Sequence, residues 1–534
     1  MATTFWLRIF GYLAVFTLFR VSAENPYRFY TWTATYGNIS VLGTPQQVIL
    51  INEQFPGPTI DVVTNDNIVL NLFNNLDEPF LLTWNGIKQR KNSWQDGVLG
   101  TNCPIPPGGN YTYVFQAKDQ IGTYSYFPST QLHKAAGGYG AFIVHKRPQI
   151  PIPHPIPDGD FNLLVGDWYK ANHKVLRQSL DAGASLPFPD GILINGKRQA
   201  MFTGVTGKTY MFRFSNIGLS TSLNVLIQGH KMKLVEVEGS QSIQTMYDSL
   251  DVHVGQSVAV LVTLDQPSKD YFIAISARFT NQSLLATAVL HYGDSTTSVS
   301  GLPPSPSYGL EGSMAQARSF RWNLTASAAR PNPQGSFHYG TIPISRTIKL
   351  ANTPVFIAGK QRFGVNGVSY VNPDTPLKLA DHFNISGVFS LNTVGVIQSG
   401  GAPSLGTTVL GLNLHDFVEI VLQNNEKTMQ SWHLDGYDFW VVGFGSGQWS
   451  PDSRTSYNLV DALTRHTAQV FPESWTTILV SLDNQGMWNM RSAAWDRQYL
   501  GQQLYMRVWT SEQSLANEKP IPANALRCGK AVFR

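Results

Sequence analysis

The pair His433 and Asp435, in the run Trp-His-Leu-Asp at residues 432–435, could do chemistry. If this run is a strand, both side chains point to the same face, because side chains alternate along a strand. An imidazole beside a carboxylate can move protons or contribute to a metal site. The alternative is a hydrogen-bonded pair buried beside Trp432, and a lone histidine holds a transition metal only weakly. We favour the buried pair.

Histidine and cysteine, the other residues that bind transition metals, are sparse. The twelve histidines are scattered, and no His-x-His occurs anywhere in the chain. The only cysteines are Cys103 and Cys528. In an oxidising compartment this pair predicts one disulfide, which would tie the first domain to the last residues of the chain. Two unpaired thiols are the alternative.

The N-terminus indicates such a compartment. Arg8 precedes an apolar run over residues 9–19, and Ala23 suits cleavage of a signal peptide over residues 1–23. The run is shorter than the roughly 20 residues of a transmembrane helix. Cleavage would remove Arg8 and Arg20 and lower the formal charge from +4 to +2 (4 − 2), which is too little to suggest nucleic acid as a partner. The C-terminus has no apolar tail, so we expect no lipid anchor.

Glycosylation sites fit the same route. Five Asn-x-Ser/Thr triplets occur in the chain, and their acceptors are Asn38, Asn110, Asn281, Asn323 and Asn384. We therefore expect a secreted, extracellular glycoprotein.

The elements that must position these residues repeat three times. Each repeat is a run with alternating apolar positions, a polar turn and a second run that ends in Gly, as expected of strands with one face inward. The three pairs of runs are 66–75 with 82–86, 209–216 with 225–229, and 416–425 with 431–436. A repeat of this size predicts three β-sandwich domains and an all-β fold.

Proline-rich breaks set the domain boundaries. Residues 148–157 hold five prolines, and a second break begins at Gly301. The resulting division is a signal peptide at 1–23 and domains at 24–148, 158–300 and 345–534, with a connection at 301–344 that wraps between domains.

Six phrases carry a family resemblance. They are Phe-Pro-Gly-Pro-Thr-Ile at 55–60, Trp-Asn-Gly at 84–86, Gly-Thr-Tyr-Ser-Tyr at 122–126, Gly-Asp-Trp at 166–168, Leu-Ile-Asn-Gly at 193–196 and Trp-His-Leu-Asp-Gly-Tyr-Asp-Phe at 432–439. In this order they resemble plant multicopper oxidases, above all ascorbate oxidase and its "skewed"-type relatives, including the pollen-specific secreted members. The resemblance implies three consecutive cupredoxin-like β-sandwiches with Greek-key connections.

The resemblance also implies copper, held in the family by ten histidines and one cysteine in four motifs, often with an axial methionine. In this chain only His433 keeps the expected residue type. The other positions hold residues that do not replace imidazole or thiolate, and arginine stays protonated. The positions are Thr83, Asn85, Phe127, Ser129, Gln430, His433, Asp435, Arg491, Ser492, Ala493, Arg497 and Gln502. We therefore expect no bound copper and no catalytic residues.

Arg491 and Arg497 have two interpretations. They could fill the former copper cavity as an ion-pair network with Asp435, which we favour because buried charges need partners. They could instead form an anion pocket for a uronic-acid sugar or ascorbate. Trp168 is either a packed aromatic or, by resemblance, a residue near the reductant. The basic run at 88–91 is either solvated surface or a contact for acidic pectin.

Three functions follow. The first is a non-catalytic glycoprotein of the cell wall or pollen-tube matrix, in contact with wall polysaccharide or another apoplastic protein. The second is an ascorbate-oxidase-type oxidoreductase, which requires copper. The third is a binder of acidic sugars or small organic acids in the former active-site cleft.

Overall fold

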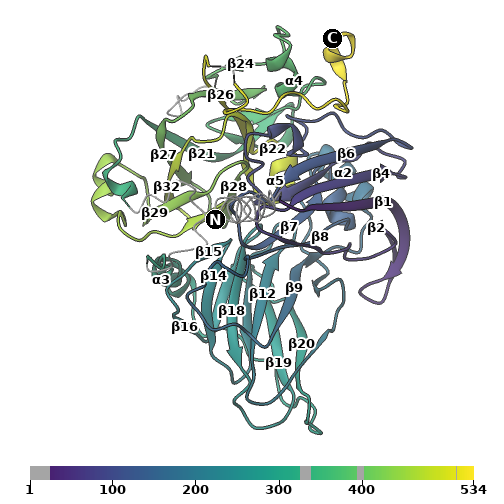
Figure 1. Cartoon of the computed structure of the whole chain (residues 1–534), viewed down its shortest axis with the longest axis vertical. Coiled ribbons are helices and arrows are strands. Elements are labelled where there is room, and N and C mark those ends of the chain that lie inside the picture. Colours follow the sequence, from purple (N-terminus) through teal and green to yellow (C-terminus); the bar gives the residue numbers. More distant parts are fainter. Residues whose placement is uncertain (1–24, 325–337, 394–401, 513) are drawn as a thin grey trace, which may run out of the picture.

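The computed structural model describes residues 25–324, 338–393, 402–512 and 514–534, so the predicted signal peptide lies outside the described residues. In these parts of the chain the strands form six sheets, two in each of three successive domains. The domains form three lobes, from purple-blue through teal to green and yellow (Figure 1). The predicted all-β class is confirmed.

The first domain packs the sheet β2-β1-β4-β6 against the sheet β3-β8-β7-β5. Its strands are β1 (Tyr27–Ser40), β2 (Pro45–Ile51), β3 (Ile60–Val63), β4 (Asn67–Asn74), β5 (Leu82–Asn85), β6 (Asn110–Gln116), β7 (Gly122–Pro128) and β8 (Gly140–His145).

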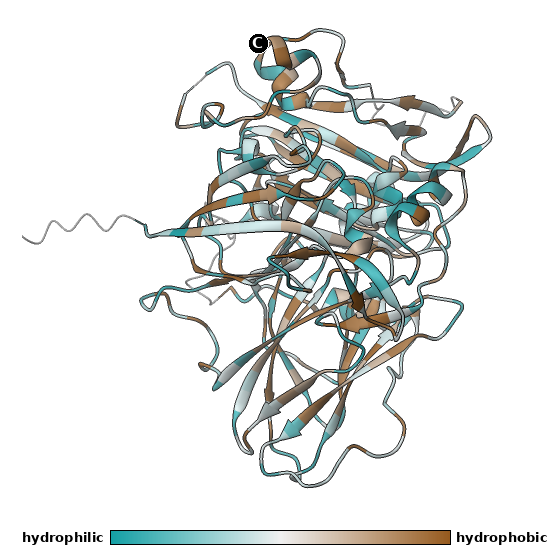
Figure 2. Ribbon diagram, turned by 90° about the vertical axis from the view of Figure 1, so that its right-hand side faces the viewer, coloured by the Kyte–Doolittle hydropathy of each residue, from teal (hydrophilic) through white to brown (hydrophobic). Residues whose placement is uncertain are grey.

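The second domain packs the sheet β10-β9-β12-β18-β14-β15, with β16 beside β14, against the sheet β11-β20-β19-β13-β17. Hydrophobic stretches, brown in Figure 2, follow the strands of this domain in the lower part of the view. Its strands are β9 (Gly159–Trp168), β10 (Gly191–Ile194), β11 (Met201–Gly204), β12 (Thr209–Asn216), β13 (Leu223–Ile227), β14 (Met232–Val237), β15 (Ser240–Gln241), β16 (Met246–Tyr247), β17 (Ser249–Val252), β18 (Ser257–Thr263), β19 (Tyr271–Ala277) and β20 (Leu285–Tyr292).

The third domain packs the sheet β25-β23-β22-β21-β27-β32-β29-β30 against the sheet β24-β26-β34-β33-β28-β31. Its strands are β21 (Arg346–Ile357), β22 (Lys360–Val365), β23 (Val368–Tyr370), β24 (Ser390–Leu391), β25 (Ser404–Gly406), β26 (Thr408–Asn413), β27 (Phe417–Asn424), β28 (Gln430–Leu434), β29 (Phe439–Ser446), β30 (Thr464–Arg465), β31 (Thr467–Val470), β32 (Ser474–Ser481), β33 (Gly486–Ser492) and β34 (Gln503–Trp509).

The repeated runs of the sequence become equivalent strands. The first run of each repeat is β4, β12 or β27, and each of these lies parallel to the opening strand of its domain, β1, β9 or β21. The burial of β4 alternates as expected, but β12 and β27 are buried almost throughout. Polar partners cover their outer faces: Arg213 of β12 donates to Thr123 of the first domain, and Glu419 of β27 accepts from Arg454.

The described residues also contain four short helices, α2 (His173–Asp181), α3 (Leu310–Ser319), α4 (Leu377–His382) and α5 (Trp495–Tyr499). The Asn172 side chain caps α2 by accepting from the amide of Lys174 at 2.8 Å. The connection after residue 300 contains α3, which contacts both neighbouring domains: Gln316 accepts from the amide of Asp251 at 2.8 Å, and Met314 packs on Phe471. No helix in the described ranges is long and apolar enough to cross a membrane.

The last residues, 514–534, form a C-terminal strap that packs on the first domain. The predicted Cys103–Cys528 disulfide is confirmed and spans 425 residues of sequence. Next to it, Trp94 donates to the carbonyl of Lys519 at 3.2 Å, and Asn524 donates to the carbonyl of Thr112 at 2.8 Å. The strap therefore ties the end of the chain to the first domain covalently and by hydrogen bonds.

Opening this disulfide should destabilise the protein, because it closes a very long loop of the unfolded chain. We expect the Cys103→Ser/Cys528→Ser variant to lose about 2–5 kcal/mol of unfolding free energy. Thermal unfolding with and without reductant measures this loss, and the variant itself should no longer respond to reductant. Equal melting temperatures for the wild type and the variant would contradict a structural role for the bond.

Candidate functional site

The positions that the resemblance assigns to copper fall into two groups. One group lies in the third domain, where Gln430 of β28, Ser492 of β33 and the residues around α5 meet; it comprises Gln430, Ser492, Arg497 and Gln502. The other lies between the β5–β7 pair of the first domain and the β28–β33 pair of the third; it comprises Thr83, Asn85, Phe127, Ser129, His433, Asp435, Arg491 and Ala493. We call these the peripheral cluster and the central cluster.

The central cluster contains a buried chain of polar contacts within the third domain. The guanidinium of Arg491 donates to one carboxylate oxygen of Asp435. The other oxygen accepts from Nε2 of His433 at 3.0 Å, and Nδ1 of His433 lies 2.8 Å from the hydroxyl of Thr467. Because Nε2 carries the proton, Nδ1 of a neutral ring accepts from that hydroxyl. All four residues are at most 3% exposed, so this is the predicted buried pair with an arginine added.

On the first-domain side of the central cluster, the hydroxyl side chains bond to backbone carbonyls of the same domain. Thr83 donates its hydroxyl to the carbonyl of Asp96 at 2.9 Å, and Ser129 donates to the carbonyl of Gly97. Gly97 has a φ of +74°, and a Cβ there would lie 1.8 Å from the carbonyl oxygen of Leu82, so only glycine fits. The segment after the short 3₁₀ helix η1 (Ser93–Gln95) therefore packs against the paired strands β5 and β7.

The remaining positions of the central cluster make packing contacts. Asn85 donates to the carbonyl of Gly255 in the second domain at 3.1 Å. Ala493 is buried, and a Cβ on Gly255 would lie 3.1 Å from its methyl group. The ring of Phe127 contacts Trp495 edge to face at 5.2 Å. All three domains thus meet at the central cluster.

Burial and charge set the protonation states in the central cluster. Burial, and then the charge of Arg491, lower the pKa of His433 to about 3, so the ring is neutral. Burial raises the pKa of Asp435, but Arg491 and the hydrogen bond from His433 outweigh it and lower that pKa to about 2. Burial and then the charge of Asp435 raise the pKa of Asp96 well above its usual range, so Asp96 stays protonated. The cluster therefore contains one full ion pair, Arg491 with Asp435.

A buried lysine borders the same region. Lys134 is 3% exposed, and its ammonium lies 4.1 Å from the centre of the Phe127 ring. Burial lowers the pKa of Lys134 to about 7, with the charge of Asp167 opposing this shift and that of Arg491 adding to it. Sequence reasoning missed Asp96 and Lys134, because no motif or spacing links them to His433.

The peripheral cluster is also internally paired. Arg497 binds both carboxylate oxygens of Glu426 at 2.8 Å, and it donates to the amide oxygen of Gln502 at 3.2 Å. Gln502 in turn donates to Gln430 at 3.1 Å. The hydroxyl of Ser492 is buried without a hydrogen-bond partner among the described residues. Arg497 therefore pairs with Glu426 and not with Asp435, a partner that the sequence did not suggest.

Trp168 and Lys88, for which the sequence left two interpretations each, are both buried. Trp168 is 2% exposed, donates to Gln46 at 2.9 Å and packs on Phe55, in agreement with a packed aromatic. Lys88 is buried and pairs with Asp438 at 2.6 Å, so the expectation of a solvated or pectin-contacting surface is wrong for this residue. Periodicity does not reveal a buried lysine when its partner is 350 residues away in the chain.

The glycosylation acceptors are distributed over the surface. Asn38, Asn110, Asn281 and Asn384 are exposed, whereas Asn323 is half-buried next to the undescribed residues 325–337. Attachment of sugar at these sites stays a prediction.

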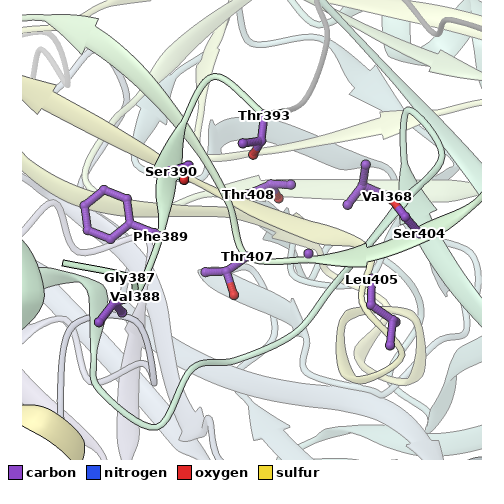
Figure 3. A pocket seen from close by; sticks show the side chains of 11 residues that line it. Val368, Gly387, Val388, Phe389, Ser390, Thr393, Ser404, Leu405, Thr407 and Thr408 are labelled. Carbon is purple, nitrogen blue, oxygen red and sulfur yellow. The ribbon is translucent and has the colours of Figure 1, made fainter.

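A hollow of about 440 Å³ lies in the third domain, where β23, β24, β25 and β26 meet (Figure 3). Its lining is made of hydroxyl groups and apolar side chains, such as Thr407, Phe389 and Leu405. None of its described lining residues is an acid, a base or a cysteine, so this hollow does not supply acid–base or metal chemistry.

The neutral state of His433 has a consequence for stability. The folded pKa lies below the unfolded value of about 6.5, so the unfolded chain binds more protons and stability falls as the pH drops from about 6.5 towards 3. This one residue should remove ~2 kcal/mol of unfolding free energy between pH 7 and pH 5. Urea unfolding at pH 7 and pH 5 measures this loss. The decrease in unfolding free energy should be smaller by this amount for His433→Gln than for the wild type. Equal decreases for the two proteins would contradict a neutral His433.

Family models for multicopper oxidases match residues 33–149, 159–295 and 374–514. The chain is 52% identical to an L-ascorbate oxidase homolog of Nicotiana tabacum, over 95% of this chain and 94% of the relative. It is 48% identical to the monocopper oxidase-like protein SKU5 of Arabidopsis thaliana, over 95% and 90%, and 28% identical to an L-ascorbate oxidase of Cucurbita maxima, over 98% and 96%.

Solved structures share the fold at low identity. The multicopper oxidase Fet3p superposes with a TM-score of 0.76 at 21% identity and covers 90% of each chain. A laccase from Botrytis aclada gives a TM-score of 0.74, also at 21% identity, over 91% of this chain and 88% of the laccase. The expectation of three cupredoxin-like domains is confirmed, and the chain belongs to the multicopper oxidase family.

Proposed function

We propose that this protein is a secreted, non-catalytic member of the multicopper oxidase family that binds no copper at the family's two centres and acts in the cell wall or pollen-tube matrix. The observation that carries the proposal is the ion pair of Arg491 with Asp435 in the central cluster. A permanent cation occupies a ligand position and already neutralises the one carboxylate there. A copper ion would have to displace that guanidinium into a dry interior.

The donor atoms of both clusters also argue against copper. The central cluster offers hydroxyl, amide, phenyl and methyl groups beside the single imidazole of His433, and both nitrogens of that ring make hydrogen bonds. The peripheral cluster offers two amides, a hydroxyl and the paired Arg497. A blue-copper site needs a thiolate, and both cysteines of the chain are in the disulfide. These donors do not fit the family's copper ions.

The extracellular setting is supported by three features. The disulfide is typical of oxidising compartments, four of the five sequon acceptors are exposed, and residues 1–23 have the pattern of a signal peptide. The relatives named L-ascorbate oxidase supply the rival proposal, an oxidase that needs copper.

Metal analysis of the secreted protein separates these two functions. We expect far less than one copper ion per chain and no blue thiolate-to-copper absorption band, because neither cluster provides the ligands. The control is an L-ascorbate oxidase that is expressed and purified in the same way. Stoichiometric copper with a blue band in this protein would establish the oxidase instead.

A second candidate function, binding of acidic polysaccharide, is favoured by a different part of the surface. Arg491 and Arg497 are paired with carboxylates, so the former copper cavity does not offer a free anion site. A hollow of about 320 Å³ near the C-terminal strap is instead lined by Arg90, Lys91, Lys118 and Lys519. We call it the basic hollow.

Some groups of the basic hollow are available to a ligand. Arg90 pairs with Asp483 at 2.9 Å and Lys118 with Asp119 at 3.2 Å, but the ammonium groups of Lys91 and Lys519 have no carboxylate partner among the described residues. These two free cations suit the carboxylate groups of uronic acids.

Titration with oligogalacturonide tests this second function. We expect saturable binding that the variant Lys91→Gln/Lys519→Gln weakens by about tenfold or more, because it loses two charge-assisted hydrogen bonds. Lys170→Gln, which changes another exposed lysine, should bind like the wild type. A neutral oligosaccharide should not bind. Equal affinity for the double variant and the wild type would contradict binding in the basic hollow.

A further inference from the structure

Glu78, His133 and His173 come together where the first and second domains meet. Glu78 lies in the loop after β4, His133 begins the short helix η2 (His133–Ala136), and His173 begins α2 of the second domain. One ligand atom from each lies within 4.8 Å of the other two. It is the one group of three histidine, cysteine or acidic side chains within ligand distance among the described residues, and it includes no position of the two copper clusters.

The distances in this group suit a metal better than they suit hydrogen bonds. Nε2 of His133 lies 3.3 Å and Nε2 of His173 lies 3.5 Å from the same oxygen, Oε2 of Glu78. Hydrogen bonds to a carboxylate are usually about 2.7–2.9 Å when charge assists them. Ligands at about 2.0–2.1 Å from a tetrahedral Zn²⁺ lie about 3.3–3.4 Å apart. The two observed distances match the edges of such a tetrahedron.

His173 provides a second, independent indication. Its side chain is buried, and neither ring nitrogen makes a hydrogen bond among the described residues. A buried polar group without a partner is costly, and this ring faces Glu78 and the ring of His133, whose centre is 5.5 Å away. A metal ion between the three side chains would satisfy the ring.

Neighbouring residues hold the other two ligands in place. Nδ1 of His133 lies 2.8 Å from the hydroxyl of Thr130, which can accept the proton of that nitrogen and leave Nε2 free to bind. Arg177 donates to Oε1 of Glu78 at 2.7 Å, so Oε2 is the oxygen that faces the histidines. Such outer contacts are typical of metal sites, because they fix the ring tautomer and the carboxylate orientation.

The local charge limits the affinity but does not exclude a cation. Arg177 is 2.7 Å and Lys174 is 3.6 Å from Glu78, and both repel a metal. Lys174 is held more closely by Asp77, whose two oxygens both lie 2.9 Å from its ammonium. The side chains of Asp77, Glu78, Lys174 and Arg177 therefore sum to zero charge when the histidines are neutral. The hydroxyl of Tyr36 is the remaining polar group, 3.4 Å from Oε2 of Glu78.

We propose that Glu78, His133 and His173 bind one Zn²⁺, with water as the fourth ligand. Two imidazoles and a carboxylate suit zinc among the divalent cations, and three protein ligands leave one position for water. The ion would link α2 of the second domain to η2 of the first domain and to the loop that carries Glu78. Leu132 and Leu176 already pack in one hydrophobic cluster across this contact. The site uses no residue of the copper clusters, so it is independent of the proposed function.

Calorimetric titration of the full, metal-stripped protein with Zn²⁺ tests the site. We expect one zinc ion per chain and a loss of affinity of at least about tenfold in both His173→Gln and His133→Gln, because each removes a ligand. The matched control is His145→Gln, since His145 also lies 3.0 Å from a carboxylate, Asp61, but belongs to no group of three ligands in the part of the chain that the structure describes. This control should bind like the wild type.

A second measurement does not depend on variants that might misfold. Co²⁺ in the wild-type protein should give the intense visible absorption of a four-coordinate ion. Absence of stoichiometric Zn²⁺ binding, unchanged affinity in His173→Gln, or the weak absorption of octahedral Co²⁺ would each overturn the proposal. Copper content and the blue band do not enter this test, so failure of the zinc site and failure of the proposed function remain distinguishable.

Discussion

The buried ion pair between Arg491 and Asp435 is the interaction on which the centre of this molecule depends. It lies between the β-sandwiches, where water does not compete, so each charge needs the other. Burial and then the charge of Arg491 lower the pKa of His433, and Arg491 with the hydrogen bond from His433 outweighs burial at Asp435 and lowers its pKa. Burial and then the charge of Asp435 raise the pKa of Asp96. The electrostatics of the central cluster therefore depend on its burial and on this one ion pair.

Packing explains the glycines beside the positions that the resemblance assigns to copper. A Cβ at Gly86 would lie 2.3 Å from the ring of His466, and one at Gly436, where φ is +81°, would lie 2.4 Å from Trp488. Neither constraint involves copper. The backbone conformation at these glycines is therefore compatible with the ion pairs and amides that surround them.

Several polar contacts join the domains, in addition to a hydrophobic cluster that all three share. The central cluster joins all three domains, the C-terminal strap ties the third domain to the first, and the group around Glu78 ties α2 of the second domain to the first. Both proposed ligand sites, the basic hollow and the zinc site, lie at such joints. A ligand bound at either site would stabilise the packing of domains against one another rather than a single sandwich.

The sequence by itself determined the features that depend on residue type and local period. Three alternating runs predicted three sandwiches, two cysteines left a single possible bond, and the residue types at the family's ligand positions argued against copper. The tertiary structure decided the partners: Glu426 for Arg497, Asp438 for Lys88, and the meeting of Glu78, His133 and His173. These residues are far apart in the chain, so they meet only after the domains have packed. Local patterns carry no information about such contacts, because long-range packing alone sets which charges are removed from water together.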